Sequence, residues 1–533
     1  NFLEDGPGSV VYSRAFASRR DAAAGTMNRL YAIESTPTLT GAAADHALHV
    51  RPSQIETIAR AMARKLGVDS PGLEVSDATQ VQLVDEIAKD LQAHAGAGLV
   101  IAGDSQPAIV HAIAHAINEK LGNAGKTVTY IDPVEADPFD QNESLRTLVR
   151  DMAAGNVDTV IIVGVNPVYD APADLDFSSA LQKVNHRAHM GLYQDETSDL
   201  CHWHLPESHY LESWGDCRAF DGTVALIQPF IAPMYGGKTA VELMAALFGK
   251  GGSTYDLVRA YWQNERGTEG FDKLWRESLA KGVVESSTFQ PKQAAVAANA
   301  TTAPQQPAQQ QGIELSFRPD PTIGDGRWTN SGWLQELPKP LTKLTWDNAV
   351  ILSINTASKL GVEMFDEVEV KAGNRSVRGQ VWVQPGHPDD VATLHLGYGR
   401  TRSGHVGDGT GFNAYMVRTS EAPSFAGGAS ITRTGKGAQF ARTELHQVMT
   451  EEDRPLARLF KLEDFKVKSA DELHDLPYAL VPKDTIFPNY PYKGYKDAAW
   501  GMAIDMNKCT GCGVCAIACQ AENNIPVVGK EQV

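Results

Sequence analysis

The segment 158–164, D-T-V-I-I-V-G, is a short run of mostly β-branched residues that ends in a glycine. A continuous apolar run of this length predicts a strand buried on both faces, as in a parallel sheet. Two earlier segments have the same character, G-L-V-I-A-G at 98–103 and T-V-T-Y-I at 127–131. We therefore expect these three segments to be strands of a parallel sheet.

Helix-like segments stand between and before these runs. Ser53 and Glu56 have the spacing of a capping box, and Gly67 stands where a C′ glycine would end the helix. Further helices are expected at about 76–94, 107–121 and 142–154. Strands that alternate with helices indicate an α/β doubly wound region over residues 1–245.

The composition changes after this region. Residues 246–312 predict a helical segment followed by a Gln/Pro/Ala-rich linker, because 294–312 carries too little apolar surface to offset its ordering entropy. Residues 313–445 predict a β-barrel, since β runs recur at 350–354, 366–373, 376–383 and 391–396. The glycines of 395–413 predict a long loop with close backbone approach. A polar connector is expected at 446–490.

The charge of the chain argues against one class of partner. The 533 residues include 48 Lys and Arg against 65 Asp and Glu, a formal net charge of −17. A chain this acidic, without a basic run, is not suited to neutralise phosphates, so we expect no nucleic-acid partner. No stretch approaches the roughly 18 apolar residues that a membrane span needs. Because the chain begins at Asn1 and ends soon after a cofactor motif, we expect a fragment of a longer polypeptide.

Four of the six cysteines stand in C-T-G-C-G-V-C-A-I-A-C-Q at 509–520. The spacing C-x2-C-x2-C-x3-C is typical of iron–sulfur clusters, and in the bacterial ferredoxin arrangement the fourth cysteine ligates a different cluster from the first three. We therefore predict that Cys509, Cys512 and Cys515 hold one 4Fe–4S cluster and that Cys519 ligates a second. Residues 491–533 would then be the start of a ferredoxin-type domain.

Two other uses of these cysteines stay open at this point. A zinc ribbon would use paired C-x2-C units separated by a longer spacer, and a disulfide framework would use the thiols in pairs. The run also departs from the bacterial ferredoxin pattern, because Gln520 stands where a proline usually follows the last cysteine. That departure argues against a simple soluble ferredoxin, not against a cluster.

The other two cysteines, Cys201 and Cys217, carry a weaker signal. They could be buried free thiols, a disulfide, or metal ligands together with His202, His204 and His209. Buried thiols are the commonest outcome, so no metal is predicted there. No C-x-x-C-H occurs in the chain, so it attaches no c-type haem.

Several stretches resemble the molybdopterin oxidoreductase superfamily. Segments 98–123, 160–169 and 204–216 are similar to successive parts of its α/β domains, and 355–373 resembles its C-terminal double-psi barrel. The tail from Cys509 to Asn524 resembles the separate four-cluster electron-transfer subunit of the same enzymes. The resemblance implies an α/β, molybdopterin oxidoreductase-like fold, then a molybdopterin dinucleotide-binding-like double-psi barrel, then the ferredoxin-type domain.

The fusion of both parts in one chain, together with segment 27–46, resembles the large iron–sulfur subunit of bacterial alternative complex III. That resemblance implies a respiratory electron relay from quinol toward cytochrome c or an oxidase, with no substrate-converting site in this chain. It also implies a scaffold domain without molybdopterin, further 4Fe–4S clusters and one 3Fe–4S cluster. The partners would be an integral membrane quinol-binding subunit and haem c-containing subunits, on the periplasmic side of the inner membrane.

The sequence also allows a second function, that of a molybdenum enzyme. In a molybdenum–pterin oxidoreductase of the polysulfide or thiosulfate reductase type, the pterin would lie between the α/β and barrel domains. Gly164, Asn166 and Pro167, together with the glycine-rich segment 404–411, would then line the cofactor.

Overall fold

The computed structural model describes residues 1–25, 27–297, 299–304, 312–443, 461–469, 472 and 501–533. The α-helices are α1 (Ser9–Ser18), α2 (Leu39–Ala43), α3 (Pro52–Lys65), α4 (Ala78–Ala93), α5 (Ala108–Lys120), α6 (Gln141–Ala153), α7 (Pro167–Asp170), α8 (Phe177–Leu181), α9 (Glu196–Asp199), α10 (Ala240–Leu247), α11 (Thr254–Arg266), α12 (Phe271–Lys281), α13 (Gly332–Glu336), α14 (Ile354–Leu360), α15 (Leu462–Val467) and α17 (Val514–Glu522). Short 3-10 helices lie at Ala22–Ala24, Ala173–Leu175 and Ala414–Val417.

The strands are β1 (Tyr31–Glu34), β2 (His46–His49), β3 (Thr159–Val163), β4 (His186–Gly191), β5 (Trp203–Pro206), β6 (Gly215–Arg218), β7 (Val224–Ile227), β8 (Val283–Val284), β9 (Ile313–Arg318), β10 (Val350–Leu352), β11 (Asp366–Ala372), β12 (Arg375–Val383), β13 (Val391–His395) and β14 (Phe425–Lys436).

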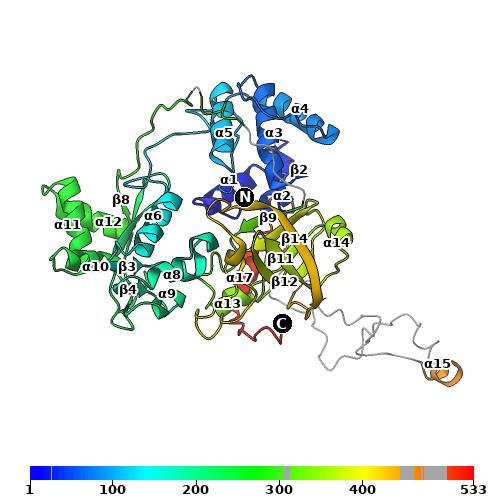
Figure 1. Cartoon of the computed structure of the whole chain (residues 1–533). Helices are drawn as coiled ribbons and strands as arrows, with labels where there is room; N and C mark the ends of the chain where they lie inside the picture. The colour runs from blue at the N-terminus through cyan, green and yellow to red at the C-terminus, as the bar shows by residue number, and fades with distance from the viewer. Residues whose placement is uncertain (26, 298, 305–311, 444–460, 470–471, 473–500) are drawn as a thin grey trace, which may run out of the picture.

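The first group of elements packs helices α3, α4 and α5 near the parallel strands β1 and β2 (Figure 1). The predicted helices at 76–94, 107–121 and 142–154 are confirmed as α4, α5 and α6. Apolar side chains of α3–α5 recur at helical spacing and share one core, which includes Ile55, Ile58, Val84, Ile113 and Ile117.

The predicted capping box of α3 is wrong. The helix begins at Pro52 with Arg51 as its N-cap. Ser53 instead donates from its backbone N–H and its hydroxyl to the carboxylate of Glu314 in β9, at 3.0 and 2.6 Å. Proline presets the helical φ at the first position, which leaves Ser53 available for this tertiary contact. The C′ glycine is confirmed, because Gly67 follows the helix with a φ of +75°.

Two of the three predicted strands form no ladder. Residues 98–103 lie beside α5, where Val100 N donates to Asn118 Oδ1 at 2.9 Å and Asn118 Nδ2 donates to Val100 O at 2.6 Å. Residues 127–131 make only isolated bridges. One side-chain amide thus satisfies the backbone groups that a neighbouring strand would pair. Within the described residues the region 1–245 therefore holds two small parallel sheets and two strands of an antiparallel one, where one doubly wound sheet was expected.

The segment 158–164 does form the predicted strand, β3, in the parallel sheet β3–β4–β5. Val160 and Ile162 of β3 pack in one core with residues of α6 and α8. Gly164 ends the strand with a φ of +68° and leads toward α7. The carboxyl end of this sheet therefore carries the loop G-V-N-P. In the alternative molybdenum–pterin enzyme, this loop would line the pterin.

A further lobe follows, in which the antiparallel strands β6, β7 and β8 pack with α11 and α12 (Figure 1). Its core joins Val224 and Leu226 to Val258 and Trp262, so side chains on both sides of residue 245 pack together. The domain boundaries drawn from the sequence stay predictions.

Part of the expected linker is hydrogen-bonded to the helix group, in part through one arginine. Residue 298 and residues 305–311 lie outside the described residues, whereas 299–304 are described. Arg60 in α3 is fully buried and donates to the carbonyls of Pro71, Thr301 and Ala303, at 2.6, 3.4 and 2.8 Å. The 299–304 segment is thus fastened to the helix group by hydrogen bonds.

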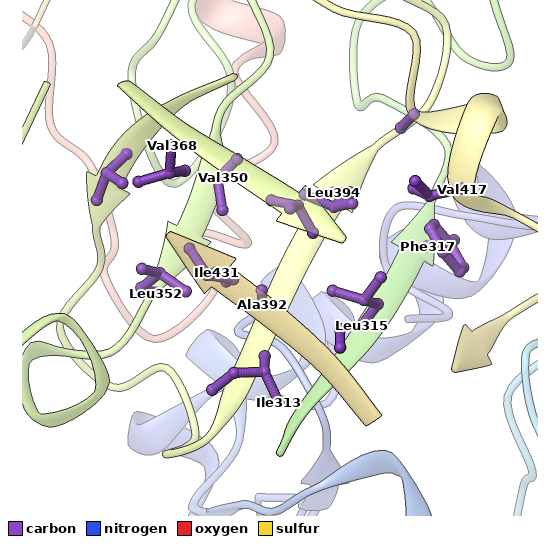
Figure 2. Packing of buried hydrophobic residues seen from close by; sticks show 14 of the residues in the cluster. Ile313, Leu315, Phe317, Val350, Leu352, Val368, Ala392, Leu394, Val417 and Ile431 are labelled. Carbon is purple, nitrogen blue, oxygen red and sulfur yellow. The ribbon is translucent and has the colours of Figure 1, made fainter. Parts of the chain in front are cut away.

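The predicted β-barrel is confirmed as a closed barrel of six strands in the order β10–β12–β11–β14–β9–β13. Its interior is filled by apolar side chains, among them Leu315, Val350, Val368, Leu394 and Ile431 (Figure 2). The four predicted strands are β10–β13, and β9 and β14 complete the circle. β14 has no clean alternation, because its register shifts at the glycines between Ala426 and Ala429. The double-psi connectivity stays a prediction.

The glycine-rich loop after β13 makes the predicted close backbone approach. A Cβ on Gly397 would lie 2.7 Å from Gly324 O, and a Cβ on Gly399 would lie 2.2 Å from Asn413 N. Both glycines have positive φ, +98° and +69°. No side chain fits at either position, so the loop requires glycine there.

The last described segment, 501–533, contains α17 and lies against the barrel domain near α13 (Figure 1). Most of the expected connector 446–490, and residues 491–500 of the expected ferredoxin-type domain, lie outside the described residues. Among the described helices, none is both long and apolar enough to cross a membrane.

Candidate iron–sulfur site

A tight loop followed by a helix carries the four predicted cluster cysteines. Cys509 N donates to Asp505 O at 2.9 Å and so closes a turn before the loop. Gly511 and Gly513 both adopt left-handed φ values, +75° and +74°, and Gly513 is the N-cap of α17. Only glycine adopts this conformation without strain, so the small residues between the cysteines let the backbone curl.

The helix places the last two cysteines on one face. Cys515 lies in the first turn of α17 and Cys519 follows four residues later. Asn523 Nδ2, one turn further on, donates to Cys519 Sγ at 3.5 Å and to Cys519 O at 3.0 Å. Hydrogen bonds to sulfur are among the features that set the potential of an iron–sulfur cluster. This contact therefore suits a thiolate ligand at Cys519.

The thiols themselves are free and exposed at Cys509, Cys512, Cys515 and Cys519. Among the described residues, no three His, Cys, Asp or Glu side chains are gathered closely enough to hold a metal ion. The structure thus brings the cysteines onto one loop and helix but does not close them around a centre. Four unpaired thiols on a glycine-hinged loop fit an iron–sulfur cluster in donor type and backbone freedom, and the ligand assignment stays a prediction.

One cation stands directly before the first cysteine. Lys508 Nζ lies 3.1 Å from Asp21 Oδ2 and 3.9 Å from Asp505 Oδ2. The hydrogen bond from Lys508 holds the pKa of Asp21 below its usual value. On the same side, a Cβ on Gly511 would lie 3.4 Å from Leu39 in α2. The cysteine loop is therefore seated against the N-terminal part of the chain.

The second cysteine group divides between two environments. Cys201 is half-buried against the α6–β3–α8 core, where burial raises the pKa of its thiol. Cys217 is exposed on β6, so the buried-thiol interpretation is wrong for this residue. Both thiols are free, which gives the disulfide interpretation no support.

The three histidines of this stretch have local partners and no common centre among the described residues. Arg187 Nη2 lies 3.0 Å from His202 Nε2, and His204 Nδ1 lies 3.1 Å from His189 Nδ1. His209 Nδ1 accepts from the backbone N–H of Leu211.

Sequence reasoning missed a buried ion pair at the α/β–barrel junction. Arg400 Nη2 lies 2.8 Å from Glu196 Oε2, and the two side chains are only 7% and 11% exposed. Asn166 Nδ2 donates to the same carboxylate at 2.7 Å, while Asn166 Oδ1 accepts from Thr197 Oγ1 at 2.6 Å. The amide of the G-V-N-P loop is therefore committed to the protein's own side chains. Two residues separated by 204 positions give no local signal of this pairing.

The glycine-rich segment 404–411 is likewise filled by its own chain. A Cβ on Gly404, Gly407 or Gly411 would lie 2.4–2.5 Å from side-chain atoms of Asn330, Thr329 or Asn348. Gly409 alone has open space beside it. These three glycines are therefore required by close packing against the protein's own side chains.

Comparison with known proteins places a match on the cysteine segment. Residues 502–522 match the family model of the 4Fe–4S binding domain. A stretch of 26 residues is 77% identical to the menaquinone reductase iron–sulfur cluster-binding subunit of Nitratidesulfovibrio vulgaris, over 5% of this chain and 10% of that subunit. The match thus spans about a tenth of that relative's length.

Two further likenesses differ in extent. A stretch of 27 residues is 59% identical to the arsenate respiratory reductase iron–sulfur subunit ArrB of Chrysiogenes arsenatis, over 5% of this chain and 90% of that sequence. Acetylene hydratase from Pelobacter acetylenicus superimposes with a TM-score of 0.46 at 12% identity, over 75% of this chain and 70% of that one. Residues 502–522 are therefore similar to the 4Fe–4S binding domain, and the cysteine segment is similar to part of the iron–sulfur subunits of two reductases.

Proposed function

We propose that this chain is the electron-transferring iron–sulfur subunit of a membrane-bound, quinol-oxidising respiratory complex of the alternative complex III kind. The observation that carries the proposal is the C-x2-C-x2-C-x3-C run on a loop and helix, fused to a large α/β and barrel body. The name of one relative, menaquinone reductase, supports chemistry with quinones. Electrons would pass from quinol toward cytochrome c or an oxidase.

In this proposal Cys509, Cys512 and Cys515 hold one 4Fe–4S cluster and Cys519 contributes to a second. When bound, such clusters supply one-electron transfer. The chain's own residues set the surroundings: the amide of Asn523 donates to a ligand sulfur, and Lys508 places a positive charge beside the first ligand. Further 4Fe–4S clusters and a 3Fe–4S cluster belong to the same proposal.

The α/β and barrel body acts as a scaffold without molybdopterin in this proposal. Support comes from packing, because Asn166 of the G-V-N-P loop and most glycines of 404–411 are packed against neighbouring side chains. No substrate is converted by residues of this chain. The partners are an integral membrane quinol-binding subunit and haem c-containing subunits, with the body on the periplasmic side of the bacterial inner membrane.

The ligand assignment is tested by Cys512→Ala in the purified complex. We expect the loss of one reduced-cluster EPR signal, because a 4Fe–4S cluster needs all of its thiolates. Cys217→Ala is the matched control, since Cys217 is an exposed free thiol on β6 and should leave the spectrum unchanged. An unaltered spectrum in the Cys512 variant would show that this thiol is not a ligand.

A further inference from the structure

Four consecutive residues beyond α17 dock onto the barrel domain. Val527 contacts the backbone of α13, where a Cβ on Gly332 would lie 3.1 Å from Val527 Cγ1. Val528 N and Gly529 N donate to the carboxylate of Glu336, at 3.1 and 2.9 Å. Residues 527–530, here called the tail, therefore follow α13 closely, within eight residues of the helix that carries two of the cysteines.

Glu336 accepts hydrogen bonds from the body as well as from the tail. Its Oε2 accepts from the indole N–H of Trp346 at 3.2 Å as well as from the tail amides. Trp346 is buried, so the carboxylate is held in place by a rigid group of the body. A charged acceptor for two successive backbone N–H groups makes stronger hydrogen bonds than a neutral one.

The next residue of the tail makes an ion pair. Lys530 Nζ lies 2.6 Å from Asp347 Oδ2, and the Asp347 side chain is 9% exposed. The other oxygen, Asp347 Oδ1, accepts from Gly411 N at 3.1 Å in the glycine-rich loop. Asp347 is thus oriented by the barrel domain before the tail arrives, which limits the entropy lost when Lys530 docks.

The cysteine segment is held at its other end too. Lys508, the residue before Cys509, pairs with Asp21 at 3.1 Å. The four cysteines therefore lie between two contacts with the body, one before the loop and one after the helix. Contacts between domains are ordinarily small and permit relative motion, so two fixed ends restrict a motion that would otherwise be expected.

We infer that Glu336 and Asp347 are positioning residues for the cluster of Cys509, Cys512 and Cys515: they fasten the tail and so hold the cluster segment in one place on the body. The inference rests on the proposed function, because it needs a cluster at these cysteines. Solvent exposure and hydrogen bonds to sulfur set cluster potentials, and both change when the segment is free to move. The body thereby tunes the cluster as well as carrying it.

The first experiment uses the full chain in its complex, with Glu336→Gln and Glu336→Ala. Hydrogen exchange at Val528 and Gly529 should speed up about tenfold or more, since hydrogen bonds to a charged group contribute roughly 1.5–3 kcal/mol. The potentiometric EPR titration of the first cluster should shift or broaden with the iron content unchanged. Glu363→Gln is the matched control, because Glu363 is an exposed barrel acid that pairs with Lys436 and not with the tail.

A second set of variants begins with a change in the tail. Lys530 is half-exposed, so Lys530→Glu should fold normally while it opposes Asp347. We expect faster tail exchange and the same EPR shift, and partial recovery when Lys530→Glu is combined with Asp347→Asn, whose amide can still accept from Gly411 and donate to the new carboxylate. Loss of protein stability alone would not be repaired in this way.

The outcomes separate the two proposals. A wild-type complex without reduced-cluster signals would overturn the proposed function. Normal wild-type signals, together with unchanged tail exchange and unchanged titrations in the Glu336 and Lys530 variants, would overturn the positioning role alone.

Discussion

At the residue scale, the pair Arg400 and Glu196 connects the α/β region to the barrel. Arg400 donates to Glu196 through two nitrogens, stacks over the ring of Tyr169 at 4.7 Å, and reaches Gly326 O at 2.7 Å. Burial by itself would raise the pKa of Glu196, but the hydrogen bonds and charge of Arg400 lower it to about 2. The carboxylate is therefore charged in the folded protein throughout the physiological range.

Glu196→Gln should destabilise the protein by about 3–5 kcal/mol, because it leaves the buried guanidinium without a counter-charge. The matched control is Asp199→Asn, which breaks an exposed pair with Arg402 and should cost at most about 1 kcal/mol. Denaturant unfolding of the two variants gives both values. Equal losses would mean that Arg400 is stabilised by Tyr169 and the backbone rather than by Glu196.

The same pair predicts a pH dependence. The pKa of Glu196 is lower in the folded state than its ordinary value of 4.5, so its contribution is complete above pH 4.5 and is lost as the pH falls toward 2. The stability difference between wild type and Glu196→Gln should shrink over that interval. A difference that stays constant from pH 5 to pH 2.5 would contradict the assignment.

At the scale of elements, the glycine-rich loop needs glycine mainly because its backbone packs closely against other backbone atoms, and less because glycine is flexible. Gly399→Ala should destabilise the protein by roughly 3 kcal/mol or more, because it adds a methyl group against Asn413 N to the cost of a left-handed φ. Gly373→Ala is the control: its φ is +59°, its surroundings are open, and only about 1–2 kcal/mol should be lost. Thermal unfolding compares the two, and similar losses would show that the loop relaxes around the methyl group.

Some helices and strands can be predicted from the local sequence pattern, whereas other segments cannot. The helices α4–α6 follow from helical periodicity and the strands β10–β13 from short β runs, because each pattern lies within its own segment. The segment 98–103 has an equally good strand pattern, but Asn118 pairs with its backbone and no ladder forms. Ser53 has the sequence pattern of a helix cap, but its hydroxyl donates to the carboxylate of Glu314 instead. In both cases a residue distant in sequence or on a neighbouring helix outweighs a local preference.

At the scale of the whole molecule, the two functions differ in metal content. We expect iron and no stoichiometric molybdenum in the purified complex, because the segments that would line a pterin are packed with side chains. Metal analysis by mass spectrometry measures both elements in one sample, with the Cys512→Ala complex as the control for cluster iron. One molybdenum per chain would contradict the scaffold role and favour the polysulfide or thiosulfate reductase type.

The sequence by itself determined the chemistry of the cysteine segment and the class of the barrel. Ligand spacing in C-x2-C-x2-C-x3-C and the short β runs of the barrel are properties of a few neighbouring residues, so they can be identified without a fold. Only the tertiary structure decided where the cysteine segment sits. Its partners Asp21, Glu336 and Asp347 lie 183 to 487 residues away along the chain, and contacts between surfaces that far apart leave no periodicity in the sequence.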